Sequence, residues 1–275
     1  MRAITASIVT YNNEPEMLQR AIGSFLNSGL DGRLYVVDNS PTRKIEGLCK
    51  DERIEYVFNN KNIGFGAGHN IAIQRSKGMS AYHLILNPDV FFETGVLENI
   101  YDFMEANRDA GLLMPRICYF DGRIQYLCKL LPTPLDLAVR RCDFRILNGV
   151  FRRRFDRYEL KFAGYDRIMD VPHLSGCFMF IRRDAFDKAG LFDTRFFMYL
   201  EDVDLSRRIH KYFKTVYHPG FVAYHQHAKH SYSDPKAFMH HVVSAIRYFN
   251  KWGWFFDKER KMINRRILKG CSLKF

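Results

Sequence analysis

The stretch NKNIGFGAGHNIAIQRSKGMSAYHLILNPDV, residues 60–90, contains the pattern from which the fold can be read. A glycine-rich entry leads into a helix-like segment at 64–76, a strand-like apolar run follows at 82–86, and the sequence Asn-Pro-Asp at 87–89 ends the strand. A helix followed by a buried strand and a polar turn is the repeating unit of a parallel α/β sheet. Ligands of such sheets bind beyond the carboxyl ends of the strands, where this turn lies.

The residues before and after this stretch repeat the same alternation. Strands are predicted at 3–10, 33–38 and 54–58, and helices at 14–28 and 96–107, where apolar side chains recur at helical spacing. This rhythm predicts an α/β fold with a Rossmann-like, mainly parallel sheet flanked by helices.

The second half of the chain is less regular. Residues 122–169 mix Pro, Arg and aromatic residues without a clean period, and we interpret them as a variable insert. Beyond the insert we expect strands at 173–181 and 215–222 and helices at 184–189, 202–210 and 234–252. We therefore expect one α/β domain over residues 1–232, with a small antiparallel portion in its second half. A basic helical tail should follow over 233–275.

Composition limits the classes of protein that fit. With 275 residues, 47% hydrophobic and 26% charged, the chain can bury a full core. The sequence contains no run of about 18 apolar residues, so no transmembrane helix is predicted. The N-terminus lacks the apolar core of a signal peptide. We expect a cytoplasmic protein. The six Cys form no C-x-x-C pair, so neither a zinc site nor a disulfide framework is expected.

The net charge of +12 is concentrated in two segments. Residues 140–168 hold nine Lys and Arg against four Asp and Glu, and residues 250–275 hold eight against two. Such basic segments indicate a polyanionic partner: nucleic acid, anionic lipid or a phosphate-rich substrate.

Three polar turns, each with a carboxylate, follow strand-like or aromatic segments. Residues 38–40 (DNS) close the strand at 33–38, residues 87–89 (NPD) close the strand at 82–86, and residues 201–202 (ED) follow an aromatic run. A single acid in such a place is ordinarily a turn residue or a helix cap. Three acids that reach one sheet edge indicate a ligand site.

Seven stretches in a fixed order carry a resemblance to a known family. They are IVTYNN (8–13), VVDNS (36–40), NKNIGFGAGHNIAI (60–73), LILNPDV (84–90), LSGCFMFIRRDAF (174–186), GLFDTRFFMYLEDVDLSRRI (190–209) and YHQHAKHS (224–231). The chain resembles family 2 glycosyltransferases of the GT-A fold, especially the bacterial rhamnosyltransferase-like branch. The resemblance implies an inverting, metal-dependent hexosyltransferase that moves a sugar, with rhamnose as one candidate, from a dTDP- or UDP-sugar to an acceptor hydroxyl in bacterial surface polysaccharide synthesis. It also implies a nucleotide-sugar half at about 1–115 and an acceptor half at about 116–232.

The resemblance places the nucleotide sugar on residues of the first half. An ionised carboxylate only accepts hydrogen bonds, so Asp38 would accept one from the imide N–H of uracil or thymine. The glycines at the helix entry would let the backbone approach the ligand, and a helix N-terminus favours anionic groups. The implied nucleotide-sugar residues are Thr10, Tyr11, Asn12, Asp38, Asn62, Gly64, Phe65, Gly66, Asn70 and Asn87.

The resemblance also implies a divalent metal, Mn²⁺ or Mg²⁺, between the enzyme and the diphosphate. Asp89 matches the last carboxylate of the family's D-x-D motif, and Asn87 replaces the first. One carboxylate plus substrate phosphates suits a hard cation that keeps waters. His225 or His227 would contact the metal or the diphosphate, with His230 as a third candidate, and an imidazole ligand would favour Mn²⁺.

Asp202 is the candidate general base, because an inverting transfer needs one carboxylate to take the proton of the acceptor hydroxyl. Glu201 is its rival, and Asp204 is interpreted as a first-turn helix residue that favours the helix dipole. Ser175 and Gly176 are expected to form the floor of the acceptor site, for a glycan or lipid-linked acceptor.

Two other classes of protein fit the sequence less well. A nucleotidyltransferase-like nucleotide-sugar enzyme would carry basic residues in its first loop, whereas TYNNEP at 10–15 has none. A non-catalytic nucleotide- or nucleic-acid-binding protein would not need the carboxylates at 38, 89 and 202, and no nucleic-acid module is recognisable, so no nucleic acid is expected as a partner.

Two interpretations of the C-terminal tail stay open. Met262, Ile263, Ile267 and Leu268 share one helical face with Lys and Arg elsewhere, which is typical of a helix lying in an anionic membrane surface. The enzyme would then be peripheral on the inner face of the cytoplasmic membrane. The same pattern also fits a helix packed on the domain with a solvated basic face.

Overall fold

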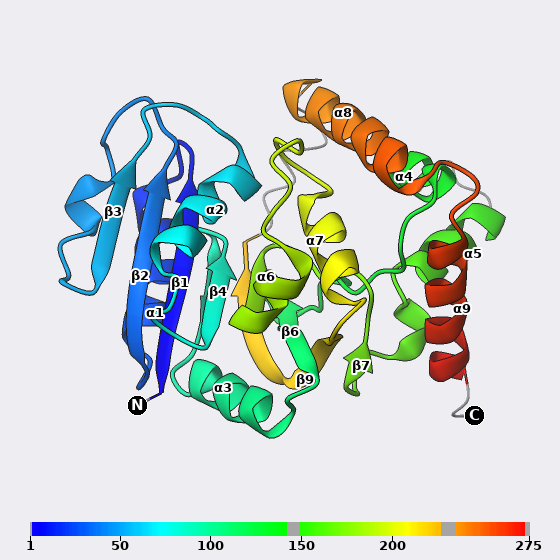
Figure 1. Ribbon diagram of the computed structural model, residues 1–275, viewed down its shortest axis with the longest axis horizontal. Coiled ribbons are helices and arrows are strands. Elements are labelled where there is room, and N and C mark those ends of the chain that lie inside the picture. Colours follow the sequence, from blue (N-terminus) through cyan, green and yellow to red (C-terminus); the bar gives the residue numbers. More distant parts are fainter. Residues whose placement is uncertain (1, 142–148, 227–234, 273–275) are drawn as a thin grey trace.

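The computed structural model describes residues 2–141, 149–226 and 235–272 and shows one twisted sheet between layers of helices (Figure 1). The strands are β1 Ala3–Thr10, β2 Asp31–Asp38, β3 Ile54–Phe58, β4 Tyr82–Leu86, β5 Val90–Phe92, β6 Ala110–Cys118, β7 Met169–Asp170, β8 Phe178–Arg182 and β9 Lys214–His225. The helices are α1 Pro15–Leu26, α2 Phe65–Arg75, α3 Val96–Ala106, α4 Pro134–Arg141, α5 Gly149–Tyr158, α6 Arg183–Ala189, α7 Glu201–Ile209, α8 Pro235–Trp252 and α9 Lys258–Ser272.

The sheet has a parallel half and a mixed half. Its strand order is β3-β2-β1-β4-β8-β6-β9-β5, with β7 paired to β9. The first four strands in this order are parallel, and β8 then runs antiparallel to both β4 and β6. β9 is parallel to β6, while β5 and β7 are antiparallel to β9. The prediction of a mainly parallel sheet with a smaller antiparallel portion is confirmed.

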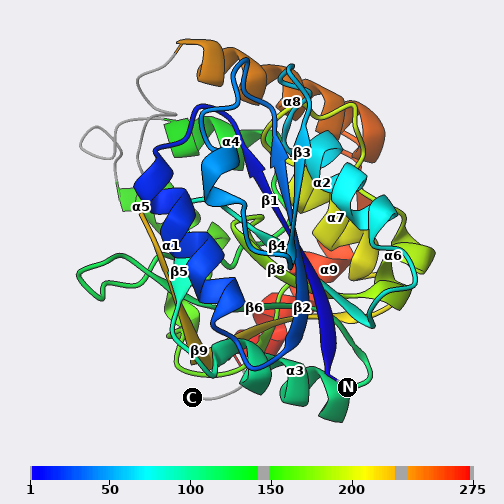
Figure 2. The same ribbon diagram turned by 90° about the vertical axis from the view of Figure 1, so that its left-hand side faces the viewer.

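The central strands are buried on both faces because helices cover them. Every residue of β4 and of β8 is buried, which matches their continuous apolar sequences YHLIL and FMFIR. Figure 2 shows the sheet nearly edge-on, with α1 on one side and α2, α6 and α7 on the other. The carboxyl ends of β1, β2 and β4 therefore reach a common edge of the sheet.

The predicted boundaries agree well in the first half and less well in the second. β1, β3 and β4 have the predicted bounds, whereas β5 and β6 were not predicted. Residues 122–169, which we interpret as a variable insert without a clean period, contain two short helices that were not predicted, α4 and α5. Their Arg-rich sequences hide the helical period, since few positions on each short helix are buried.

The C-terminal helix packs on the domain. Ile263 and Ile267 are each 6% exposed and belong to the same buried cluster as the sheet residues. Leu268 packs against that cluster, and only Met262, at 65% exposed, faces solvent. The apolar face is therefore occupied by protein, which corrects the expectation that this face could lie in a membrane. No helix within the described residues is both long and apolar enough to cross a bilayer.

Buried ion pairs join α7 to the two C-terminal helices. Arg207 is 1% exposed, lies over the ring of Trp252, and forms two bonds of 2.7 and 2.9 Å with the carboxylate of Asp257. Glu259 accepts a further bond of 2.7 Å from the same guanidinium. The contacts of Arg207 fix the start of α9 against α7.

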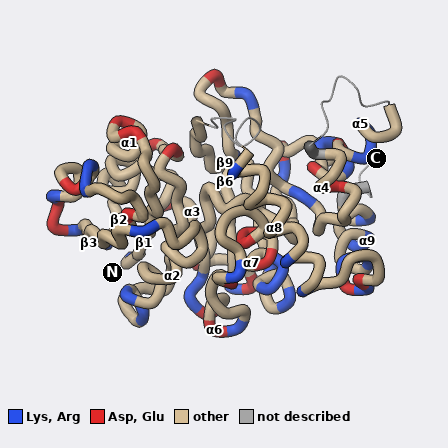
Figure 3. Tube along the Cα trace, turned by 90° about the horizontal axis from the view of Figure 1, so that it is seen from above, with Lys and Arg blue, Asp and Glu red and all other residues tan. Residues whose placement is uncertain are grey.

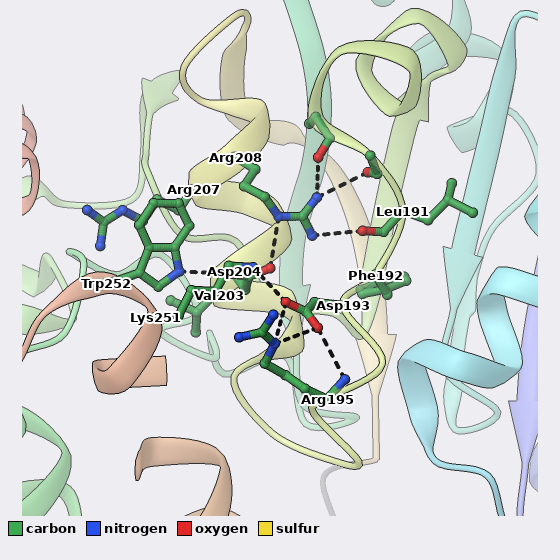
Figure 4. Close-up of polar contacts among 12 residues, drawn as sticks. Leu191, Phe192, Asp193, Arg195, Val203, Asp204, Arg207, Arg208, Lys251 and Trp252 are labelled. Atoms are coloured by element: carbon green, nitrogen blue, oxygen red, sulfur yellow. Dashed lines mark hydrogen bonds and ion pairs between the residues drawn. The ribbon is translucent and has the colours of Figure 1, made fainter. Parts of the chain in front are cut away.

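A second cluster lies one turn earlier on α7. Asp204 is fully buried and accepts hydrogen bonds from Arg208 and the indole of Trp252, each at 2.8 Å, and from Lys251 at 2.7 Å (Figure 4). Asp204 lies in the first turn of α7, as predicted. Asp204 also has a role beyond the helix dipole, because its contacts join α7 to the end of α8.

We predict that Arg207→Met lowers the free energy of unfolding by about 3–5 kcal/mol, because it leaves the carboxylate of Asp257 buried without its cation. Urea unfolding followed by fluorescence measures the change. Arg195→Met is the matched control, since Arg195 is 53% exposed in its pair with Asp193 and should cost less than about 1 kcal/mol. Equal stability of the Arg207 variant and wild type would show that this cluster does not hold α9.

Candidate active site

A cleft opens at the edge where β1, β2 and β4 end, and most of the predicted site residues line it. Its walls come from both halves of the sheet, from the segment between β6 and α4, and from α7 and α8. The predicted residues that line it are Thr10, Tyr11, Asn62, Gly64, Phe65, Asn87, Asp89, Ser175, Gly176, Glu201, Asp202 and His225.

Two consecutive residues before β8 hold the two acidic segments in register. The backbone N–H of Gly176 donates to Oδ2 of Asp202 at 3.0 Å. The carbonyl of Cys177 accepts a bond of 2.9 Å from the N–H of Asn87. A Cβ at Gly176 would lie 3.2 Å from that of Asp202, so only glycine allows this approach without a shift.

Asp89 and His225 meet in the same cleft. His225 ends β9, which pairs with β5 directly after the Asp89 turn, and the N–H of Gln226 donates to the carbonyl of Asp89 at 3.1 Å. The Nε2 atom of His225 lies 3.3 Å from Oδ2 of Asp89. Sheet pairing therefore brings together two side chains that are 136 residues apart in sequence (225 minus 89).

Gln125 sets the tautomer of His225. Its side-chain amide donates from Nε2 to the carbonyl of His225 at 2.8 Å, so its Oε1 is the atom that lies 3.0 Å from Nδ1 of the ring. Because Oε1 only accepts, Nδ1 carries the hydrogen and Nε2 faces Asp89. Two electron-pair donors that face each other in this way favour a proton or a cation between them.

This pair fits a divalent cation that keeps substrate or water ligands. Among residues 2–141, 149–226 and 235–272, no group of three or more His, Cys, Asp or Glu is arranged to enclose a metal. Asp89 and His225 would therefore supply a minority of the ligands, as a hard cation bound to phosphate oxygens tolerates. His227 and His230, the other candidates, lie outside the described residues.

Asp202 is held as a carboxylate. Burial raises its pKa, but the hydrogen bond and charge of His173, the N–H of Gly176 and the charge of Lys129 outweigh burial and lower the pKa to about 2. The side chain of Asp202 is 20% exposed, and Nε2 of His173 lies 3.7 Å from its Oδ2. An ionised oxygen therefore borders the cleft at every ordinary pH.

Glu201, the next residue, has the opposite character. Burial and the charge of Asp202 raise its pKa to about 8. Its side chain lies in the buried start of α7, with 6% of the residue exposed and no hydrogen-bond partner for Oε2. At neutral pH Glu201 is therefore mainly a neutral acid, unsuited to accept a proton.

Three residues that influence Asp202 or His225 were not predicted from the sequence. Gln125 and Lys129 come from the segment taken to be irregular, and His173 precedes the predicted LSG motif by one residue. Lys129 and His173 are 4% and 3% exposed, and the N–H of Lys129 donates to the carbonyl of His173 at 3.1 Å. No periodic signal marks these positions, but buried charge beside a polar turn could have drawn attention to Lys129.

The glycine-rich entry to α2 fits closely against the loop before α7. Gly64 has φ +91, and a side chain there would collide with the carbonyl of Phe197. The N–H of Phe65 donates to that same carbonyl at 3.0 Å, and Asn62 accepts a bond from the N–H of Gly64 at 3.0 Å. The turn is thus pinned from both sides beside the cleft.

Asp38 is fully buried below this turn. Its carboxylate accepts hydrogen bonds from the hydroxyl of Thr10, the N–H of Ser40 and the hydroxyl of Tyr56, at 3.2, 2.9 and 2.7 Å. Because Asp38 is fully buried, a base could reach its carboxylate only if a neighbouring side chain moved. Tyr56 is partly exposed and is the neighbour whose movement would open this path. The contact with uracil or thymine stays a prediction.

Besides the buried Asp38, three residues of the predicted nucleotide site do not line the cleft, namely Asn12, Gly66 and Asn70. The amide of Asn70 makes two bonds with the backbone of Phe192, and a Cβ at Gly66 would lie 2.8 Å from the Cβ of Phe192. The N–H of Asn12 donates to Ser40 at 2.9 Å. Asn70 and Gly66 therefore dock α2 on the loop after α6, and we expect no nucleotide contact from them.

A comparison with protein families matches residues 5–190 to the model named Glycosyl transferase family 2. The chain belongs to this family. The matched range contains nearly all of the parallel half of the sheet, the Asp89 turn and the segment before β8 that bonds to Asp202.

Curated relatives and a solved structure agree with this assignment. N-acetylglucosaminyl-diphospho-decaprenol L-rhamnosyltransferase of Mycobacterium tuberculosis is 29% identical over 86% of this chain and 81% of the relative. Rhamnosyltransferase WbbL of Escherichia coli is 26% identical over 78% of this chain and 81% of the relative. The crystal structure of GalNAc-T7 with UDP, GalNAc and Mn²⁺ shares the GT-A fold with a TM-score of 0.60 at 15% identity, covering 81% of this chain and 43% of that one. This family 2 member is thus a glycosyltransferase that resembles rhamnosyltransferases.

The raised pKa of Glu201 predicts a pH-dependent stability. Glu201 binds its proton more tightly in the folded protein than in the unfolded chain, so its protonation stabilises the fold. This stabilisation is complete below the unfolded pKa of 4.5 and is lost as the pH rises through about 8. Glu201→Gln mimics the neutral acid at every pH. Relative to wild type, the variant should therefore gain at least about 1 kcal/mol between pH 5 and pH 8.

Urea unfolding at the two pH values measures this difference. Glu93→Gln, a substitution at an exposed acid, is the control and should leave the pH dependence unchanged. A parallel pH dependence of wild type and Glu201→Gln would mean that Glu201 is ionised in the folded protein.

Proposed function

We propose that the chain is an inverting, metal-dependent glycosyltransferase that transfers a hexosyl group, with rhamnosyl as the first candidate, from a dTDP- or UDP-sugar to the hydroxyl of a lipid-linked glycan. The observation that carries this proposal is that one cleft is lined both by an ionised Asp202 and by the pair of Asp89 and His225.

The diphosphate of the donor would lie between the turn of Asn87 and Asp89 and the N-terminal end of α2. Thr10, Tyr11 and Asn62 line this part of the cleft, and Tyr11 is 49% exposed there. The exposed ring of Tyr11 can lie against a nucleoside, while the buried Asp38 would read its imide N–H. Thymine and uracil present the same imide, which is why both nucleotides are retained.

A divalent cation bound by Asp89 and Nε2 of His225 would neutralise the charge that develops on the departing diphosphate. The solved GT-A relative contains Mn²⁺ with UDP, and an imidazole ligand favours Mn²⁺ over Mg²⁺. Gln125 would then hold the ring in the tautomer that presents a lone pair to the cation.

Asp202 would act as the base that takes the proton of the acceptor hydroxyl as the hydroxyl attacks the anomeric carbon. Its carboxylate is already ionised, and the N–H groups of Gly176 and Val203 hold both oxygens in place, at 3.0 and 2.8 Å. The neutral Glu201 cannot take this role at pH 7. A single displacement needs no nucleophilic carboxylate and inverts the anomeric centre.

The acceptor would enter over Ser175 and Gly176, where Lys129 adds positive charge beside the ring of His173. The name of the mycobacterial relative describes an N-acetylglucosaminyl-diphospho-decaprenol acceptor, and WbbL is also named a rhamnosyltransferase. A lipid pyrophosphate and a basic protein attract each other, which supports a role in surface polysaccharide assembly at the cytoplasmic face of a membrane.

We predict that Asp202→Asn lowers the turnover for transfer by about 100-fold or more, because the acceptor proton loses its base, while affinity for the nucleotide changes little. Radiolabelled sugar transfer and calorimetry measure the two quantities. Asp187→Asn removes an equal charge from an exposed site on α6 and should act as wild type. Wild-type turnover of Asp202→Asn would rule out Asp202 as the base.

We predict that dTDP or UDP binds with micromolar affinity in Mn²⁺ and far more weakly in EDTA. Asp89→Ala should remove the metal dependence, and Gln125→Leu should weaken Mn²⁺ binding by about 10- to 100-fold because the ring of His225 loses its orienting partner. Calorimetry gives the nucleotide affinities, and electron paramagnetic resonance of free Mn²⁺ gives the metal affinity. Gln74→Leu on the exposed face of α2 is the control. Metal-independent binding of both nucleotides would exclude the metal role.

A further inference from the structure

The two basic segments of the sequence meet in space. A groove at the end of the molecule opposite β3 lies between α4, α5 and α9, and Figure 3 shows Lys and Arg positions along these helices. The exposed Arg157 and the half-buried Arg154 of α5 face Lys261 and Arg265 of α9 across it. Segments about 100 residues apart thus form one cationic surface.

The helix α9 has two distinct faces. Its inner face is fixed by Ile263 and Ile267 in the core and by Asn264, whose amide makes two bonds of 2.9 Å with the backbone of Leu131. Its outer face carries an exposed basic row with helical spacing, which also borders a second hollow: Lys258, Lys261, Arg265 and Lys269. The packing of the inner face keeps this row turned towards solvent.

An apolar loop stands beside the basic row. Trp254, Phe255 and Phe256 link α8 to α9 and are 38%, 69% and 92% exposed. Met262 on the outer face of α9 adds a further apolar side chain at 65% exposed. Large apolar groups exposed together and rimmed by cations are unusual on a protein that works free in water.

We propose that this surface, the outer face of α9 with α5 and the loop 254–256, docks on an anionic phospholipid bilayer. The Lys and Arg row would lie over lipid phosphates while Phe255 and Phe256 insert at the interface. This proposal goes beyond the transferase chemistry and stands independently of it. It also replaces membrane contact through the apolar face of α9, which the protein core occupies.

A bilayer fits the surface better than a nucleic acid does. A nucleic acid would be bound by bases stacking on rings that lie along a groove. Here Trp254 and Phe255 line the groove, but the most exposed ring, Phe256, lies outside it, and the aliphatic Met262 lies beside the basic row. Aliphatic and aromatic groups together suit acyl chains and headgroups.

The helix α8 connects this surface to the cleft. Its His241 lines the cleft, and the hydroxyl of Ser244 donates to the carbonyl of Met198 at the rim, at 2.8 Å. Its last turn leads directly into the loop 254–256. A bilayer bound at this loop would therefore lie one rigid helix away from the entrance to the cleft, where a lipid-linked acceptor would arrive.

The test is co-sedimentation of the full chain with vesicles, without any sugar nucleotide. We expect binding to phosphatidylcholine vesicles that contain phosphatidylglycerol and little binding to pure phosphatidylcholine. Lys261→Gln combined with Arg265→Gln should lower the partition coefficient by about 30-fold, and Phe255→Ser with Phe256→Ser should lower it by about tenfold or more. Raising the salt from about 0.1 to about 1 M should release wild type, since the Debye length falls from about 10 to about 3 Å.

Lys77→Gln combined with Lys188→Gln is the matched control. Both lysines are exposed and lie outside α9, and the two substitutions remove the same charge as the α9 double variant. It should bind vesicles as wild type does. Equal binding by the α9 double variant and this control would overturn the proposal, as would tight binding of single-stranded RNA in place of vesicles. Nucleotide affinity is measured on the same variants. Metal-dependent nucleotide binding without vesicle binding would contradict only the docking proposal and leave the transferase proposal standing.

Discussion

The site depends on the placement of β8 between β4 and β6. Because β8 runs antiparallel to both, the two residues that precede it reach the carboxyl edge of β4. There the carbonyl of Cys177 holds the turn that carries Asp89, and the N–H of Gly176 holds Asp202. Backbone groups of two adjacent residues thus hold Asp202 and the Asp89 turn relative to each other, and a register shift in β8 would move both.

Electrostatics then separates two neighbouring carboxyl groups. Glu201 and Asp202 are adjacent, yet their pKa values shift in opposite directions, to about 8 and about 2. Asp202 accepts bonds from two N–H groups and lies near the charge of Lys129 and the imidazole of His173, whereas Glu201 is buried beside the charge of Asp202. Such a divergence is typical of sites where one acid must stay ionised.

The parallel half of the fold and most of the cleft were predictable from sequence because local patterns determine them. Continuous apolar runs gave β1, β3 and β4 their predicted bounds, and polar turns at the strand ends marked Asp89 and Asp202. Gln125, Lys129 and His173 were missed because their roles depend on tertiary contacts across the sheet. Asn70 and Gly66 were predicted to bind the nucleotide, but their contacts with Phe192 are packing contacts that the sequence motif does not reveal. The buried side of α9 was likewise ambiguous, since an apolar face can meet protein or lipid equally well.

Gln125 and Lys129 lie in the segment between β6 and α4. The N–H of Gln125 donates to the carbonyl of Ile117 in β6 at 2.8 Å, and the N–H of Lys129 donates to the carbonyl of His173 at 3.1 Å. Both positions are therefore anchored by backbone bonds, which do not depend on the identity of the side chain. A substitution at 125 or 129 can thus change the charge and the hydrogen bonding of the cleft while the backbone around it keeps its path.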